Sequence, residues 1–135
     1  MTSIFRIAVS GLNDAVARIT NAASNMVNAS SIGKLPSNSN GATSYAPKDV
    51  ITLSVQGNGD ALGVISQSVP RNPAYGVASD PSSSNANAQG LVAVPNVDLN
   101  SELVTAKGAE VSYGANAKLI KIAEKMQKSL IDALK

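Results

Sequence analysis

The chain has 135 residues, a formal net charge of +2 and only 15% charged residues. It contains no cysteine, histidine or tryptophan, which excludes thiolate and imidazole catalysis, a disulfide framework and the common zinc sites. The small net charge and an aromatic content of 3% argue against nucleic-acid binding, and no apolar run approaches the ~18 residues of a membrane-spanning helix.

The chain divides into three zones. Residues 1–29 and 97–135 have helical periodicity, whereas residues 30–96 are polar and rich in turn-forming residues. We therefore predict a mainly α fold with a small β part. The long N- and C-terminal helices pair as a coiled-coil-like bundle, and a middle β-hairpin with extended loops lies between them in the sequence.

The first zone, residues 1–29, carries a heptad pattern. Large residues alternate along it with alanines: Phe5, Leu12, Ile19 and Met26 recur every seven positions, and Ala8, Ala15, Ala22 and Ala29 stand three further on. Large residues at one seam position and alanine at the other permit close helix packing. Val9 and Val16 widen the apolar stripe, which suits contact with more than one partner helix, although an ordinary bundle helix has the same pattern. Gly33 is expected to end this segment in a left-handed turn.

The middle zone, residues 30–96, predicts one hairpin. Residues 50–55 have strong strand propensity, residues 57–60 form a turn signal, and residues 62–69 supply the returning strand. Residues 70–90 are expected to be a loop, and residues 90–95 a short extended segment. A two-stranded hairpin is marginal alone, so it must pack on the helices or on neighbouring molecules, or remain mobile.

The last zone, residues 97–135, predicts a long helix capped by Asp98 or Asn100. Gly108 and Gly114 predict either a bend or the close approach of another backbone. Asp98 and Glu102 lie near the helix start, where the helix dipole favours negative charge. The apolar residues expected to meet the first helix are Leu119, Ile122, Met126 and Leu130.

No group of residues in the sequence has the spacing of a catalytic, cofactor or metal site. The segment 57–60 lacks the lysine of a phosphate loop and the spacing of a calcium loop, and no serine has a histidine partner. We therefore predict no catalytic residues, no cofactor, no metal and no enzymatic activity.

Three motifs carry a family resemblance. Residues 22–29 (AASNMVNA) resemble the N-terminal signature of the bacterial flagellar axial proteins, which build the rod and the hook. The segments 95–98 (PNVD) and 102–104 (ELV) are similar to the start of their C-terminal helix, and residues 112–116 (SYGAN) to an S-Y-x-A-N element within it. The small size of the chain and its PNVD segment point to the proximal rod type.

The resemblance implies a structural subunit of the flagellar basal-body rod. Such subunits are exported unfolded by the flagellar type III apparatus, without a cleaved signal peptide. They assemble with themselves and with other rod proteins into a helical tube that crosses the periplasm and transmits motor torque. Basal-body ring or adaptor components are further expected partners, and no nucleic acid or membrane span is expected.

The predicted assembly interface combines the apolar stripes with motif residues. It comprises Phe5, Val9, Leu12, Val16, Ile19, Asn25, Met26, Asn28, Tyr113, Asn116, Leu119, Ile122, Met126 and Leu130. Because the terminal helices lack partners before assembly, we expect them to be largely disordered in the monomer. The alternative interpretation is a small helical adaptor or an export-associated binding module, whose stripe binds one partner helix.

Overall fold

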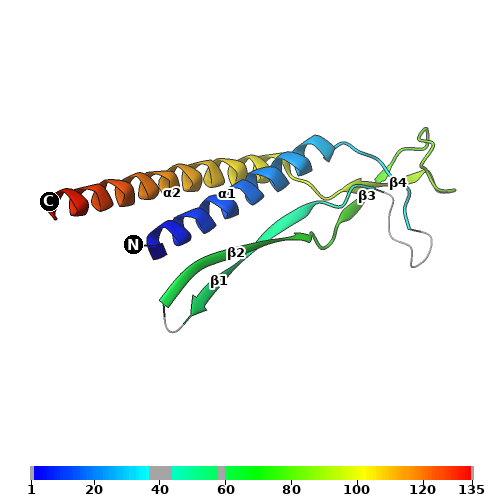
Figure 1. Cartoon of the computed structure of the whole chain (residues 1–135). Coiled ribbons are helices and arrows are strands. Elements are labelled where there is room, and N and C mark those ends of the chain that lie inside the picture. Colours follow the sequence, from blue (N-terminus) through cyan, green and yellow to red (C-terminus); the bar gives the residue numbers. More distant parts are fainter. Residues whose placement is uncertain (1, 37–43, 58–59, 135) are drawn as a thin grey trace.

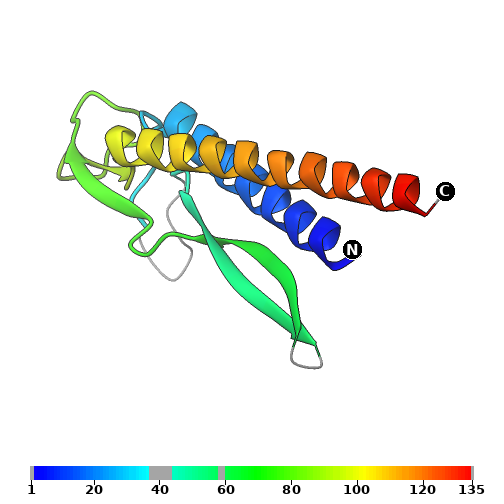
Figure 2. The same ribbon diagram turned by 90° about the vertical axis from the view of Figure 1, so that its left-hand side faces the viewer.

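The computed structural model describes residues 2–36, 44–57 and 60–134, and it is mainly helical with a small β part, as the sequence predicts. The elements in chain order are α1 (Thr2–Asn28), β1 (Lys48–Gly57), β2 (Asp60–Pro70), β3 (Tyr75–Ser79), β4 (Leu91–Pro95) and α2 (Leu99–Ala133). The two helices run side by side in opposite directions, and α1 lies between α2 and the β1–β2 hairpin (Figures 1 and 2). The sheet of β3 and β4 lies at the end of the helix pair that is remote from both termini (Figure 1).

The seam between α1 and α2 is built from small residues. The fully buried apolar residues of the two helices are all alanines, namely Ala8, Ala15, Ala22, Ala109 and Ala123. Their small side chains bring the two backbones close together: a Cβ added to Gly11 would lie only 2.6 Å from the side-chain nitrogen of Asn116. The predicted helix pair is confirmed, with the alanine row of the heptads innermost.

The register of the helix pair differs from the one predicted. Asn25 contacts Glu102, and Gly11 faces Asn116, so residues near the end of α1 lie beside the start of α2. Ile19 accordingly lines a groove with Leu103 rather than meeting the apolar residues after 118. The last turns of α2 extend past the N-terminal end of α1 (Figures 1 and 2), because α2 has 35 residues and α1 has 27.

The predicted β1–β2 hairpin is present. Its antiparallel register pairs Lys48 with Pro70 and Leu53 with Ile65, and a bulge follows Val55. Residues 58–59 of the predicted turn and residues 37–43 of the polar middle zone lie outside the described residues.

The predicted loop over residues 70–90 is wrong in part, because residues 75–79 form β3 and pair with β4. Two residues of β4, Val92 and Ala93, are buried in this second sheet region. The predicted role of Gly33 is also wrong: it forms an antiparallel bridge with Ala93 and is not among the left-handed glycines of the described residues.

Helix α2 has the predicted N-terminal cap and is one continuous helix from Leu99 to Ala133. The Asp98 carboxylate accepts a hydrogen bond from the backbone N–H of Asn100, which confirms the predicted cap. The bend or close approach expected at Gly108 and Gly114 is not observed. The helix runs without interruption through both residues, and a Cβ at either would meet nothing within 4 Å.

Candidate functional site

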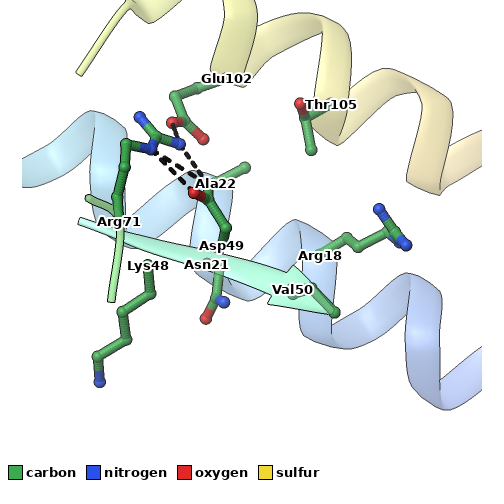
Figure 3. Close-up of a pocket in the computed structure, with 9 residues that line it drawn as sticks. All are labelled: Arg18, Asn21, Ala22, Lys48, Asp49, Val50, Arg71, Glu102 and Thr105. Carbon is green, nitrogen blue, oxygen red and sulfur yellow. Dashed lines mark hydrogen bonds and ion pairs between the residues drawn. The ribbon is translucent and has the colours of Figure 1, made fainter. Parts of the chain in front are cut away.

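A polar hub joins four distant parts of the chain. We use this name for Asn25 of α1, Asp49 of β1, Arg71 after β2, and Glu102 of α2. Figure 3 shows Asp49 and Glu102 converging on the Arg71 guanidinium from opposite sides. The hub is therefore where both helices and the hairpin are fixed relative to one another.

Asn25 is completely buried and uses its full hydrogen-bonding capacity. Its amide nitrogen donates to the Lys48 carbonyl oxygen at 3.0 Å and to Glu102 Oε1 at 3.1 Å. Its amide oxygen accepts from the Lys48 backbone N–H and from the Tyr45 hydroxyl, each at 3.0 Å. Asn25 thus pairs with both backbone groups of Lys48, as a neighbouring strand would, and fixes the start of β1 on the helix pair.

Arg71 compensates the buried charge of Glu102, whose exposed fraction is 3%. Its guanidinium donates to Glu102 Oε1 at 2.7 Å, to Asp49 Oδ1 at 2.6 Å and to the Asn96 carbonyl oxygen at 2.9 Å. The hydrogen bonds to Asp49, and next the one to Glu102, raise the pKa of Arg71 above its ordinary value against the effect of burial. Because a buried carboxylate without a partner is costly, Arg71 and Glu102 are needed together.

Sequence reasoning missed this ion pair, since it assigned Glu102 to the helix dipole. One signal was available. Glu102 stands seven residues before Ala109, on the same heptad row as Ala123, so it occupies a seam position where a charge requires a partner. The sequence does not show that this partner is Arg71, because the hairpin brings Arg71 to the seam.

A second cluster, formed by Asp14, Arg18, Thr52 and Ser66, attaches the hairpin to α1. Asp14 Oδ1 accepts hydrogen bonds from Thr52 of β1 at 2.5 Å and from Ser66 of β2 at 2.7 Å, while Arg18 donates to Oδ2 at 2.8 Å. Burial alone would raise the pKa of Asp14, but these three donors outweigh it and hold the pKa below its ordinary value. The carboxylate therefore binds both strands in its ionised form.

A pocket of about 150 Å³ lies beside the hub and is lined by residues of α1, β1 and α2 and by Arg71 (Figure 3). The charged groups Asp49, Arg71 and Glu102 at its wall are already paired with one another. Across residues 2–36, 44–57 and 60–134, no three histidine, cysteine or acidic side chains are grouped as metal ligands. The arrangement of the hub is that of a structural joint.

The residues of the predicted assembly interface fall into two groups. The apolar ones retain exposed surface in the single chain. Val9, Val16, Tyr113, Leu119, Ile122, Met126 and Leu130 are exposed, and Phe5, Leu12, Ile19 and Met26 are half-buried. Both terminal helices therefore keep apolar surface that their mutual seam does not use.

The motif asparagines make contacts within the chain. Asn25 belongs to the hub, Asn28 donates to the Ser24 carbonyl oxygen, and Asn116 donates to the Ser112 carbonyl oxygen while facing Gly11. Their part in contacts between subunits stays a prediction.

In the described part of the chain, neither helix combines the length and apolar character that a membrane crossing requires.

Comparison with known proteins identifies relatives of the chain by sequence. No family model matches the chain. Curated relatives do: the flagellar basal-body rod protein FlgC of Salmonella typhimurium and that of Escherichia coli O157:H7 are each 31% identical to it over 132 residues, covering 93% of this chain and 92% of the relative. The FlgC protein of Yersinia enterocolitica is 31% identical over 121 residues, covering 89% of this chain and 87% of the relative. With two long terminal helices and relatives matched over nearly their whole length, the chain belongs to the FlgC family of flagellar basal-body rod proteins.

Proposed function

We propose that this chain assembles with copies of itself and with other rod proteins into the helical rod that crosses the periplasm and transmits torque from the motor to the hook. The observation that supports this function best is the apolar surface left on both terminal helices. The α1–α2 seam is filled by alanines, while larger residues such as Val9, Ile122 and Met126 remain exposed. Exposed apolar residues on several faces suit a subunit with several neighbours.

The hub supports a role in bearing load. Helix α2 has 35 residues and spans about 52 Å, so a force applied at one end reaches the other through a continuous helix. Arg71 and Asn25 connect that helix to α1 and to the hairpin through charged and amide hydrogen bonds. The joint keeps the three elements from sliding past one another under torque.

The proposal includes export of the unfolded chain by the flagellar type III apparatus to the periplasmic rod. The absence of cysteine in the sequence suits such a route, because no disulfide has to form after export. A structural role also accounts for a hub whose charged groups are committed to one another. We assign no enzymatic activity to the chain and expect basal-body ring or adaptor components among its neighbours.

Incorporation into isolated basal bodies tests this function. We would express tagged chains carrying Val9→Asp or Ile122→Asp, each of which places a charge on an exposed helix stripe, and probe purified basal bodies for the tag. Val77→Asp, at an exposed valine of β3, is the matched control. Circular dichroism establishes that each variant is folded.

We expect the control to be incorporated like the unmodified chain and the two helix variants to be lost from basal bodies. Equal incorporation of all three variants would contradict the proposed use of the helix stripes. A soluble one-to-one complex of the unmodified chain with one partner, together with its absence from basal bodies, would instead support the adaptor function.

A further inference from the structure

The β1–β2 hairpin packs on α1 with its polar face and turns its apolar face outward. Directly paired residues of an antiparallel hairpin share one face, and Thr52 is paired with Ser66 on the face that bonds to Asp14. The neighbouring pair, Leu53 with Ile65, therefore lies on the opposite face. Leu53 and Ile65 have exposed fractions of 55% and 60%.

Hydrogen bonds from both strands fix this orientation. Besides the two bonds to Asp14, the Asn21 side-chain amide donates to the Ser68 hydroxyl at 3.0 Å, and the Val64 backbone N–H donates to the Ser10 hydroxyl at 3.0 Å. Gly63, with a φ of 115°, allows this close approach to Ser10, because a Cβ there would overlap the Ser10 side chain. A shift of one residue would turn the apolar face toward α1, yet the bonds select the opposite arrangement.

The end of α2 carries a second apolar surface without a partner. The seam row of α2 repeats every seven residues through Glu102, Ala109, Asn116 and Ala123, and its next member is Leu130. Leu130 lies fourteen positions after Asn116, whereas only nine residues of α1 precede Gly11, the residue opposite Asn116. Leu130 thus continues the seam beyond the end of α1 and is 50% exposed.

We propose that these two surfaces bind each other between copies: the outward face of the hairpin, formed by Ile51, Leu53 and Ile65, receives the α2 end of a second copy around Met126 and Leu130. This inference rests on the proposed rod function and names one of its contacts. Neither strand carries a charged residue at positions 50–57 or 61–69, so the outward face suits a helix that presents apolar side chains to it. The α2 end supplies such a helix in direct continuity with the α1–α2 seam.

The contact must form between copies. Within one chain, α1 lies between α2 and the hairpin (Figures 1 and 2). The hairpin's apolar face is the one opposite Thr52 and Ser66, which bond to Asp14 of α1. A chain cannot place its own α2 end on that face without breaking the Asp14 bonds. Two different surfaces of one molecule that bind each other give a head-to-tail contact, which continues along an open assembly.

Cysteine crosslinking tests the contact cleanly, because the chain has no cysteine of its own. Two differently tagged single variants, Ile65→Cys and Leu130→Cys, are mixed under assembling conditions and oxidised. Val77→Cys mixed with Leu130→Cys is the matched control, since Val77 is 59% exposed and also lies on a strand. We expect several-fold more mixed dimer from the first mixture than from the control.

Equal yields from the two mixtures would overturn the inference, as would dimers formed only between two Ile65→Cys copies. Absence of the mixed dimer while light scattering shows assembly would overturn it as well. Leu53→Cys, opposite Ile65, replaces that variant if Ile65→Cys fails to fold. Incorporation of the unmodified chain into basal bodies is measured separately, so failure of this contact is distinguishable from failure of the rod function.

Discussion

Replacing Asn25 by alanine should destabilise the chain far more than its position on a helix suggests. The change removes one hydrogen bond to the carboxylate of Glu102 and three to neutral groups, the Tyr45 hydroxyl and both backbone groups of Lys48. A bond to a charged group contributes about 1.5–3 kcal/mol and a neutral one about 0.5–1.5 kcal/mol. Glu102 retains Arg71, and alanine regains some helix propensity, so we expect a net loss of about 3–4 kcal/mol in the free energy of unfolding.

Asn28→Ala provides the matched control, because Asn28 lies one turn further along α1 and, among the described residues, its side chain donates only to the Ser24 carbonyl oxygen of its own helix. Its loss should change the free energy of unfolding by less than about 1 kcal/mol, because better helix propensity offsets one local bond. Urea unfolding followed by far-ultraviolet circular dichroism measures both variants. If Asn25→Ala unfolds within about 1 kcal/mol of Asn28→Ala, the hub does not hold the fold together as described.

Three further predictions follow from the same contacts. Asp14→Asn should lower the free energy of unfolding by about 1–2 kcal/mol. Because the pKa of Asp14 in the folded chain lies below its ordinary value of 3.8, the unmodified chain should lose this stabilisation as the pH falls below about 4. In urea unfolding, the free energy of unfolding of the variant should therefore depend less on pH in that range. Gly63→Ala should destabilise the chain by about 2–3 kcal/mol, because φ is 115° and Ser10 fills the space of a Cβ. Gly108→Ala, where a Cβ meets nothing within 4 Å, should stabilise the helix by about 0.5–1 kcal/mol. A melting temperature of Gly63→Ala at or above that of Gly108→Ala would contradict the described backbone. Hydrogen exchange on the monomer should find fast-exchanging amides at 124–134 and protected amides around Asn25; uniform protection along α2 would count against an unpartnered end.

The last prediction narrows the expectation that the terminal helices are disordered before assembly. That expectation rests on helices without partners, and it applies best to the end of α2, where Leu130 has no helix opposite it. At the other end of the pair, Asn25 bonds α1 to Glu102 of α2, and Arg71 bonds Glu102 to Asp49 of β1 within one chain. Order before assembly is therefore expected to decrease from the hub toward the termini.

The helices and the first hairpin could be predicted because their signals are local. The heptads of the first zone and the turn residues 57–60 identify their elements without tertiary information. Strand β3 could not be predicted in this way. Its five residues lie between Pro73 and Pro81, in a segment whose composition is typical of a loop. The strand exists because it pairs with β4, which begins only at Leu91, and such a tertiary contact has no local signal.

The internal contacts of the site were harder to predict than the elements. The heptad pattern shows which residues share a helix face, but the register between helices depends on Asn25 meeting Glu102 and on Gly11 facing Asn116. The hairpin illustrates the same limit. Alternation along residues 50–55 shows two faces, yet only the partners of Asp14 determine which face meets α1.

The most direct test of the central claim is electron cryo-microscopy of basal bodies isolated from cells that produce this chain as their FlgC-type subunit. Our account predicts that the chain is resolved within the rod, with its α1–α2 pair packed against neighbouring subunits through the exposed helix stripes and the hub intact. Complete rods that lack the chain, or rods in which it contacts the assembly only through its β part, would contradict that claim.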